Sequence, residues 1–545
     1  MPWATAVLSA TAVLSVTAVL WATAALWAGA GTGSGLADAA VPPSAPAASG
    51  SWTVYHGDPG GTGVAPPTSA VDTTTTRWTS PVLDGQLYGE PLIYAGRVYV
   101  ATENDTVYAL SAATGAVAWS SHLGRPVPAG SLPCGDISPS VGITGTPVID
   151  PSRGEIFVVA DEVTGRGPAH RLVGLSTASG RIEMSEDVDP PGAVPADLLQ
   201  RTGLTLDGGR VVFGMGGNDG DCATYRGRVV AVQETGGTPT YFTVDAAPGE
   251  NQGAVWMGGA APVVDGSGDI WVSTGNGSVY SYQHAYDDSD AVLELSSSLR
   301  LLQFFAPTTW PTNNSRDLDM STAPVLLPDG QVVLAGKSRI VYLLNGAHLG
   351  GIGHQQATLG ADGSAIMGSA CAEDIDGGAA VVGMTVYLPC QSGIIAVRAT
   401  GSPPALHLLW SSGTGGGPPI VAAGLVWTIG PNGVLYGLDP ATGRVRQQVT
   451  IGTPANHFPT PSVGDGLLLA PSSDRVVAFA APAPGAGPAG PTTAGSARPT
   501  EGQSHTAPAT PTHAEGRFPA AAAFGAGAVI IGLGWLLARR RHNSR

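Results

Sequence analysis

The sequence predicts an all-β fold: an eight-bladed β-propeller of four-stranded antiparallel blades, with one C-terminal transmembrane helix after it. Short apolar strands separated by tight turns recur eight times between residues 51 and 480. Residues 76–79 match the outer strand that the last copy lacks. A glycine that supplies the positive φ of a tight turn recurs in register. These glycines are Gly115, Gly180, Gly236 and Gly443.

Two copies show the repeat most clearly, PLIYAGRVYVATENDTVYALSAATGAVAWSS from Pro91 and PPIVAAGLVWTIGPNGVLYGLDPATGRVRQQV from Pro418. Each has a Pro-led apolar triplet, a glycine turn, an alternating strand, a polar turn and a second strand that ends in Leu. An Ala-Thr-Gly turn and a short last strand follow. Three or four short strands joined by tight turns predict one antiparallel meander per copy. Weaker copies begin at Pro147, Leu204, Pro262, Pro324, Ala379 and Pro461.

Radial packing explains how such sheets bury both faces, which one four-stranded sheet cannot do alone. The last copy, PSVGDGLLLAPSSDRVVAFA, has no outer strand. We expect residues 76–79 to supply it, because Trp78 stands where other copies have Trp119 and Trp410. Pairing the two ends of the chain removes the exposed sheet edge. A solenoid is the alternative fold, and seven blades are the alternative count because two copies are degenerate.

The composition excludes several classes of protein. Only 12% of the 545 residues are charged and 43% are hydrophobic, which excludes a disordered chain. The formal net charge of −16 argues against nucleic acid as a partner. Almost all basic residues are arginine, and Lys337 is the only lysine. That exception marks the position as one to test.

The N-terminal residues indicate that the protein is exported. Residues 1–40 are predicted to be a signal peptide, because the apolar run from Val7 to Leu26 is followed by the small-x-small pattern Ala37-Asp38-Ala39. No Lys or Arg precedes Arg77, so an uncleaved segment is the alternative. Residues 41–50 are a spacer, and the propeller is expected to span residues 51–480.

The C-terminal residues predict a membrane anchor. Residues 481–517 are rich in Pro, Ala, Gly, Ser and Thr, which is typical of a semi-extended linker. Residues 518–538 are uncharged and long enough to span roughly 30 Å of hydrocarbon as a helix. The basic tail, residues 539–545, is expected in the cytoplasm by the positive-inside rule. The chain is thus predicted to be single-pass in the cell membrane with the propeller extracellular; a buried Ala-Gly helix is the alternative.

The signature ALxxxTGxxxW resembles the repeat of the pyrroloquinoline-quinone (PQQ)-like propeller family. It is clearest at Ala109-Leu110, Thr114-Gly115 and Trp119, and the resemblance covers about residues 51–482. The family contains quinoprotein alcohol dehydrogenases and cofactor-free relatives, among them an outer-membrane assembly scaffold. The repeat therefore predicts the fold and says little about chemistry.

One stretch from Val211 onward resembles the active-site blades of PQQ-dependent alcohol dehydrogenases in the order of its motifs. By this resemblance Trp256 would stack on the quinone, and Lys337 would bind its ortho-carbonyl edge. Asp317 or Asp319 would act as general base and metal ligand. A carboxylate in that place could accept the alcohol proton while hydride moves to the cofactor.

The same resemblance implies a calcium site. A hard Ca²⁺ takes carboxylate and amide oxygens and polarises the quinone carbonyl. The implied ligands are Asp221, Asn276 and Asp319, with Asp219 as a second acidic candidate. His457 directly precedes a predicted innermost strand and is expected to line the same funnel.

The sequence also departs from the dehydrogenases. They commonly cover the quinone with a disulfide between adjacent cysteines, and no Cys-Cys dipeptide exists here. An Asp stands where a Glu is expected, and basic residues for three carboxylates are scarce. Each candidate has a structural alternative: strand packing for Trp256, a turn for Asn276, solvated loop charges for Asp317 and Asp319, a turn lysine for Lys337, and a hydrogen-bonded structural residue for His457.

Four cysteines, an even number, indicate an oxidising compartment and allow three pairings. Cys371 and Cys390 lie in one predicted blade, so a local bridge between them is the first choice. Cys134 and Cys222 would then pair across neighbouring blades. No CxxC spacing indicates zinc.

Two functions follow from these observations. The first is a membrane-anchored, extracytoplasmic binding module with a quinoprotein-type central pocket, whose partner is an envelope protein, a glycan or a small molecule. The alternative is a PQQ- and calcium-dependent alcohol or sugar dehydrogenase. No haem-attachment CxxCH is present, so a dehydrogenase would need a separate electron acceptor. No cofactor is assigned; PQQ and calcium are the candidates.

Overall fold

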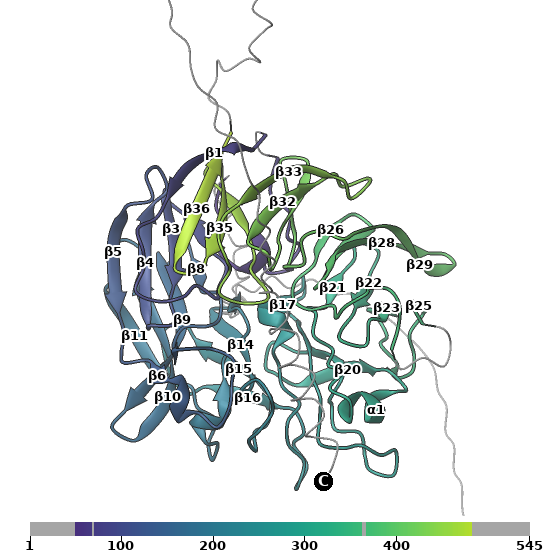
Figure 1. Ribbon diagram of the computed structural model, residues 1–545. Helices are drawn as coiled ribbons and strands as arrows, with labels where there is room; N and C mark the ends of the chain where they lie inside the picture. Colours follow the sequence, from purple (N-terminus) through teal and green to yellow (C-terminus); the bar gives the residue numbers. More distant parts are fainter. Residues whose placement is uncertain (1–49, 68–69, 362–366, 482–545) are drawn as a thin grey trace, which may run out of the picture. The chain divides into compact units, whose positions relative to one another are not determined.

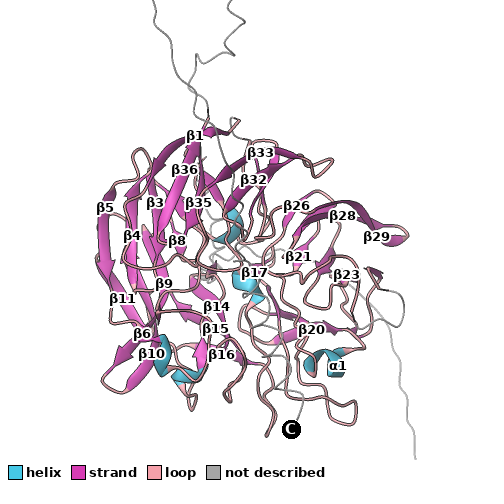
Figure 2. Cartoon of the chain, viewed as in Figure 1, coloured by secondary structure: helices cyan, strands magenta, loops and turns pink. Residues whose placement is uncertain are grey.

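The computed structural model describes residues 50–67, 70–361 and 367–481, which form eight antiparallel sheets around a common axis (Figures 1 and 2). The eight-bladed, all-β prediction is thus confirmed, and the seven-bladed alternative is excluded. Within the described residues, no helix is long and apolar enough to cross a membrane. The predicted signal peptide, the transmembrane helix and nearly all of the predicted linker lie outside these residues.

Blades 1 to 4 follow each other along the chain. The strands are given from the axis outward. Blade 1 contains β2 (Leu92–Tyr94), β3 (Arg97–Ala101), β4 (Thr106–Ser111) and β5 (Val117–His122), and blade 2 contains β8 (Val148–Asp150), β9 (Glu155–Thr164), β10 (Gly167–Ser176) and β11 (Ile182–Asp187). Blade 3 contains β13 (Thr205–Asp207), β14 (Arg210–Gly217), β15 (Arg228–Gln233) and β16 (Thr240–Thr243), and blade 4 contains β17 (Val263–Val264), β18 (Ile270–Ser273), β19 (Val292–Leu295) and β20 (Leu301–Ala306).

Blades 5 to 8 complete the ring. Blade 5 contains β21 (Val325–Leu326), β22 (Gln331–Leu334), β23 (Val341–Asn345) and β25 (Ala357–Leu359), and blade 6 contains β26 (Ala380–Val382), β27 (Thr385–Cys390), β28 (Gly393–Gly401) and β29 (Pro404–Ser412). Blade 7 contains β30 (Ile420–Ala422), β31 (Leu425–Ile429), β32 (Val434–Leu438) and β33 (Val445–Thr450), and blade 8 contains β34 (Ser462–Gly464), β35 (Leu467–Ser472), β36 (Arg475–Ala480) and β1 (Asp72–Thr79).

A few short elements decorate these sheets. The extra strands are β6 (Val127–Pro128) and β7 (Ser140–Val141), which pair with each other, β12 (Leu198–Leu199), which pairs with β14, and β24 (Gly351–Ile352), which pairs with β20. The helices are α1 (Trp310–Asn314) and the 3-10 turns η1 (Tyr55–Gly57), η2 (Ala129–Ser131), η3 (Pro195–Asp197) and η4 (Met257–Gly259).

The two ends of the propeller pair as the sequence predicts. Strand β1 lies antiparallel to β36 in blade 8, with Trp78 opposite Ala478 and Thr79 opposite Val477. The outer strand of the last blade therefore comes from the start of the chain (Figure 1). This pairing completes blade 8 and ties the start of the propeller to its end.

The recurring Trp and Gly of the repeat join neighbouring blades. The indole of Trp78, in blade 8, donates its Nε1 hydrogen to the carbonyl of Ala112 in blade 1 at 2.8 Å. Gly115 has a φ of +72° and lies so close that a Cβ there would be 2.5 Å from the Trp78 ring. The same contact joins Trp119 to Gly180 and Trp410 to Gly443. The signature is thus an interblade contact and not only a turn signal.

The N-terminal segment, residues 50–65, fills the axial channel, which the sequence analysis did not anticipate. Its backbone bonds to innermost strands of five different blades. The bonded pairs are Trp52 with Ile93, Thr53 with Ile149, Pro59 with Val264, Thr62 with Val381, and Gly63 with Val421. Tyr55 and His56 are buried in this segment. It therefore holds the blades together from inside the ring.

Candidate functional site

Four of the predicted site residues come together between blades 4 and 5. The Lys337 ammonium lies 2.9 Å from Asp317 Oδ1 and 2.5 Å from Asp319 Oδ2. The side chain of Asn276 donates to Asp317 Oδ1 at 2.8 Å, and its backbone N–H donates to Asp319 Oδ1 at 2.7 Å. Asn276 follows β18, Lys337 follows β22, and both aspartates precede β21. Loops at the same end of two neighbouring blades thus build one cluster.

Glycines before the functional residues make this cluster possible. A Cβ on Gly275 would lie 2.5 Å from Asp319 Oδ1, and one on Gly336 would collide with the Asp319 carbonyl oxygen. The Lys337 N–H also donates to that carbonyl at 3.0 Å. The Gly-Asn and Gly-Lys dipeptides therefore let two backbones approach the buried aspartate closely.

The charges in the cluster are strongly coupled. Asp319 is 1% exposed, whereas the side chain of Asp317 is 67% exposed. Burial alone would lower the pKa of Lys337, but Asp319 and Asp317 outweigh it and hold the pKa of Lys337 well above its usual range. Burial raises the pKa of Asp319, and Lys337 opposes this. The ammonium is therefore charged at neutral pH and neutralises a buried carboxylate.

Asp221 and Asp219 face the same cluster from blade 3. Burial raises the pKa of Asp221 to about 6, a hydrogen bond from Tyr225 opposes this, and the charges of Asp319 and Asp317 raise it further. The Tyr225 hydroxyl donates to Asp221 Oδ1 at 2.6 Å. Burial also raises the pKa of Asp219, and the Lys337 charge opposes that rise. The structure therefore brings both acids into the field of the lysine.

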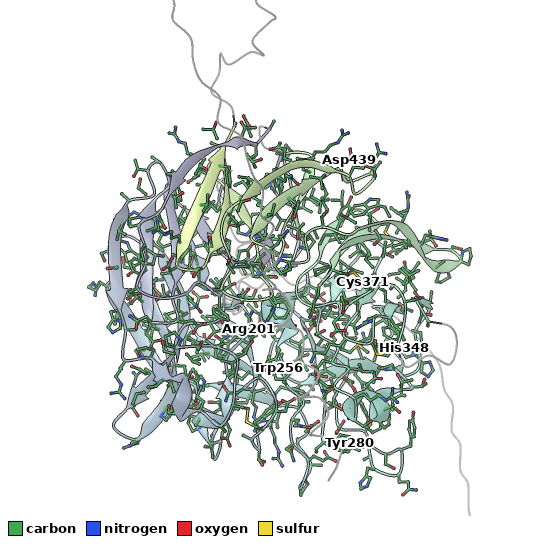
Figure 3. All side chains as sticks on the ribbon, viewed as in Figure 1. Arg201, Trp256, Tyr280, His348, Cys371 and Asp439 are labelled. Carbon is green, nitrogen blue, oxygen red and sulfur yellow. A yellow bond between two sulfur atoms is a disulfide. The ribbon has the colours of Figure 1, made fainter. Side chains whose placement is uncertain are left out.

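Trp256 and His457 lie apart from this hydrogen-bonded network. Trp256 is half-buried near the axis (Figure 3), and its Nε1 donates to the Gly217 carbonyl at 3.0 Å. The exposed His457 has its ring 6.2 Å from that of Phe458. Its charge would lower the pKa of Asp219 slightly, which places His457 on the same side of the ring as Asp219 without contact to it. No hydrogen bond joins either residue to Lys337 within the described residues.

The donors fit calcium only in part. Asn276 Oδ1 is buried and has no hydrogen-bond partner among the described residues. Such an oxygen is free to coordinate a cation. Asp221, however, accepts the Tyr225 hydroxyl, and the Lys337 ammonium already neutralises Asp319. In the described residues, the acidic side chains whose oxygens lie close enough together to hold one metal ion are at another place in blade 4: Asp265, Asp269 and Glu294. The residues around Lys337 therefore do not make up a complete calcium site.

Both disulfides form with the pairing that the sequence placed first. Cys371 pairs with Cys390 within one blade, and Cys134 pairs with Cys222 across neighbouring blades. Neither joins adjacent cysteines, so neither is the quinone cover that the dehydrogenases carry.

Other residues at this end of the blades were missed by the sequence analysis. Asp376 is buried, accepts a hydrogen bond from Gln391 at 3.0 Å and contributes to the high pKa of Lys337. Arg201 is buried near the axis (Figure 3). The signal that could have found them is position, since each lies in the loop that leads into an innermost strand. The buried charged residues within two to six positions before such a strand are Glu90, Arg201, Asp319 and Asp376.

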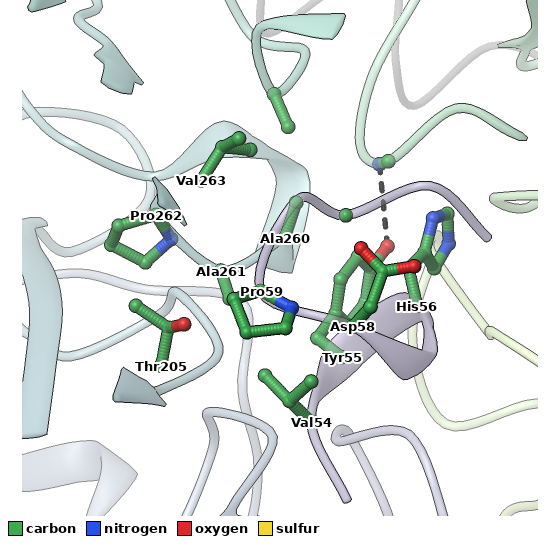
Figure 4. A pocket seen from close by; sticks show the side chains of 13 residues that line it. Val54, Tyr55, His56, Asp58, Pro59, Thr205, Ala260, Ala261, Pro262 and Val263 are labelled. Atoms are coloured by element: carbon green, nitrogen blue, oxygen red, sulfur yellow. Dashed lines mark hydrogen bonds between the residues drawn. The ribbon is translucent and has the colours of Figure 1, made fainter. Parts of the chain in front are cut away.

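A small hollow beside the N-terminal segment is lined by different residues. Tyr55, His56 and Asp58 form one side of it, and Ala260 and Val263 of blade 4 form another (Figure 4). Burial lowers the pKa of His56 to about 4, so this imidazole is neutral. None of the predicted site residues lines the hollow, and its walls are mostly apolar. It is a packing feature of the axial segment.

Asp105 lies in the turn between β3 and β4 of blade 1, and its burial predicts that the stability of the protein depends on pH. Both of its carboxylate oxygens are buried without partners among the described residues, and burial, with Asp161 and Glu103, raises its pKa to about 9. An unfolded Asp ionises near about 3.9. The folded protein thus holds an extra proton between these values, and stability falls as pH rises through this window.

Asp105→Asn removes this ionisable group. We expect the variant to gain stability over the wild type, on the order of 2 kcal/mol at pH 8, and to differ less at pH 4. Urea unfolding at the two pH values measures the difference. An equal effect of the substitution at both pH values would contradict the prediction.

Comparisons with known proteins agree with this architecture. The family model described as outer membrane protein assembly factor BamB matches residues 30–157 and 68–344. A search of curated proteins gives no match. Among solved structures, quinohemoprotein alcohol dehydrogenase ADHIIG from Pseudomonas putida HK5 is 14% identical with a TM-score of 0.60, covering 80% of this chain and 82% of that chain.

Two further solved structures resemble the chain. The quinohemoprotein alcohol dehydrogenase from Comamonas testosteroni is 15% identical with a TM-score of 0.58, covering 80% of this chain and 81% of that chain. A europium-containing methanol dehydrogenase is 12% identical with a TM-score of 0.58, covering 79% of this chain and 98% of that chain. At such identity the likeness shows the fold alone. Since the matched ranges of the family model together cover more than half of the chain, the chain belongs to the PQQ-like propeller family described as outer membrane protein assembly factor BamB.

Proposed function

We propose that the chain is a binding module of the cell envelope, whose funnel contains a quinoprotein-like cluster without quinoprotein catalysis. The observation that carries this proposal is the position of the Lys337 ammonium, which contacts both Asp317 and Asp319. A general base needs a carboxylate that can reach the proton of a substrate. Asp319 is buried and uses Oδ1 for the Asn276 N–H and Oδ2 for Lys337. Of the two carboxylates that the resemblance names as the base, Asp319 therefore has both oxygens in contact with other groups, and Asp317 has Oδ1 in contact with Lys337 and Asn276.

The location and the partner belong to the same proposal. We place the propeller outside the membrane, anchored through residues 518–538, on the strength of their apolar composition and the arginines that follow. The two disulfides support an oxidising compartment. The family is described as an outer membrane protein assembly factor, which supports an envelope protein as partner; a glycan or small molecule is the other class.

A second function, PQQ- and calcium-dependent oxidation of an alcohol or sugar, is favoured by one observation. Asn276 Oδ1 is buried without a partner in the described residues, beside the Asp319 carboxylate. A Ca²⁺ ion would satisfy such an oxygen. Trp256 would then be available as an aromatic surface for a planar quinone.

Cofactor reconstitution separates the two functions. The full-length protein is mixed with PQQ and Ca²⁺ at micromolar concentration, freed of excess, and tested for quinone absorbance and dye reduction with alcohols and sugars. We expect no retained PQQ and no dye reduction. Stoichiometric retention with Ca²⁺-dependent dye reduction would contradict the binding-module proposal. In that case Lys337→Ala should abolish retention, whereas Arg446→Ala, at an exposed arginine of blade 7, should leave it unchanged.

A further inference from the structure

Residues 123–141 form a strap between blade 1 and blade 2. Both ends of the strap are held by hydrogen bonds to blade 1, for example from the Ser140 hydroxyl to the Glu103 carbonyl at 2.9 Å. Between the ends, β6, η2 and β7 bond only to each other, and no hydrogen bond joins residues 127–139 to a described residue outside the strap. The middle of the strap is therefore held by packing and by its cysteine.

A loop of blade 3, residues 218–225, lies beside the strap and carries two acids, Asp219 and Asp221. In the described structure, the backbone of residues 219–224 forms a single hydrogen bond, from the Asp221 N–H to the Asn218 carbonyl at 3.2 Å. This bond lies within the loop itself. Within the described residues, no backbone hydrogen bond therefore ties this stretch to a strand of the propeller.

The Cys134–Cys222 disulfide joins the strap to this loop. The two segments also lie against each other, because a Cβ on Gly220 would be 3.8 Å from Cys134 Sγ. A small hollow between them is lined by the strap's Leu132 on one side and by Asp219 on the other. The disulfide therefore fixes the position of the loop that brings both acids into the field of the lysine.

The two disulfides of the protein differ in their access to solvent. Cys222 is exposed and Cys134 is half-buried, whereas Cys371 and Cys390 are 7% and 2% exposed. Thiol–disulfide exchange begins when a thiolate attacks one sulfur of the bond, so a sulfur must be within reach of the reductant. In the folded protein, a reductant can therefore reach the bond between the strap and the loop but not the bond inside blade 6.

We propose that the Cys134–Cys222 bond is a redox latch, whose reduction by a dithiol releases the strap and the loop. The two acids of the loop then leave the field of Lys337. One thiolate of the dithiol attacks the Cys222 sulfur, and Cys134 leaves as a thiolate and takes up a proton. The second thiol of the donor then displaces Cys222, so the donor becomes a disulfide and the protein gains two electrons and two protons. This inference rests on the proposed binding role of the funnel and describes its regulation.

Alkylation after mild reduction tests the access of the bond. The full-length oxidised protein is treated with dithiothreitol without denaturant, and the thiols that appear are alkylated with iodoacetamide and located by peptide mass spectrometry. We expect Cys134 and Cys222 to be alkylated at least about tenfold faster than Cys371 and Cys390. Equal rates at the two pairs, or no alkylation of the first pair at millimolar dithiothreitol, would overturn the latch.

Limited proteolysis tests what the bond holds. The reduced and alkylated protein is freed of reductant and digested with a protease that cleaves before aspartate. Cleavage before Asp219 or Asp221 should be at least about tenfold faster than in the oxidised protein, because a protease needs a locally released chain. Cleavage before Asp439, in the turn between β32 and β33 of blade 7, should keep its rate.

Two variants make the test specific. Cys134→Ser/Cys222→Ser should be cleaved at the fast rate without reduction, whereas Thr224→Ala, which keeps the bond in the same loop, should be cleaved at the slow rate. Equal cleavage of the oxidised and the reduced wild type would overturn the inference, whether or not the double variant folds. No readout of the latch uses PQQ, so its failure is distinct from that of the proposed function, which only PQQ retention with dye reduction would contradict.

Discussion

Gly115→Ala is expected to destabilise the propeller by about 3 kcal/mol, whereas Gly96→Ala is expected to cost only about 1 kcal/mol. Both glycines lie in blade 1 and have nearly the same φ, +72° and +73°. A Cβ on Gly115 would lie 2.5 Å from the Trp78 ring, whereas a Cβ on Gly96 would meet nothing within 4 Å. Comparing the two variants therefore separates the cost of a positive φ, which both have, from the cost of the clash with Trp78, which only Gly115→Ala has. Urea unfolding of the two variants measures the difference.

A double-mutant cycle identifies the partner of Gly115. In a Trp78→Ala background the added methyl group has space, so Gly115→Ala should cost no more than Gly96→Ala does in the wild type. Trp78→Ala itself is expected to cost about 3–5 kcal/mol, since it empties the contact between the first and last blades and loses the hydrogen bond to Ala112. Equal costs of Gly115→Ala in both backgrounds would show that Trp78 is not what the glycine accommodates.

The fold was predictable because its signals are local. Turn glycines, Pro-led apolar triplets and strand alternation lie within a few residues of each other, so each copy can be recognised without knowledge of the others. The copies that begin at Pro91 and Pro461 have innermost strands from Leu92 and from Ser462. Ring closure was predictable for another reason: one copy lacked a strand and residues 76–79 provided it.

The axial features were not predictable in this way. Residues 50–65 carry no alternation of their own, and their path is set by bonds to innermost strands that lie far apart in the sequence. Arg201 stands among Gln, Thr and Gly residues, and only the folded ring brings Tyr88 and Phe458 to it. Side chains that converge from several blades leave no periodic trace in the sequence.

The cluster around Lys337 lies between these cases. Its members were recognised from motifs that resemble the dehydrogenases, and the structure gathers four of them. The role of the lysine was expected to be contact with a quinone carbonyl, which remains a hypothesis. Its contact with both Asp317 and Asp319 was not predicted, because that depends on how closely the Gly336 loop approaches the backbone of Asp319.

Lys337→Met is expected to destabilise the protein by about 3 kcal/mol at pH 8, because it leaves the Asp319 carboxylate buried and unpaired. The pKa of Asp319 already lies above its usual value through burial, and removal of the ammonium raises it further. The unfolded carboxyl ionises above about pH 3.9 while the folded one keeps its proton. The stability that the substitution removes should therefore be small near pH 4 and should grow as the pH rises. Urea unfolding at pH 4, 6 and 8 measures this dependence.

The double variant Lys337→Met/Asp319→Asn separates charge from shape. It has neither the ammonium nor the ionisable carboxyl, so it should regain most of the stability that Lys337→Met loses at pH 8 and should lose the added pH dependence. Arg446→Met, which breaks the exposed pair with Asp439, is the matched control and should change stability little at any of these pH values. If Lys337→Met behaves like this control, Asp319 is not held by the lysine. The observation that favours a binding module over a dehydrogenase would then fail, because Asp319 would be free to act as a base.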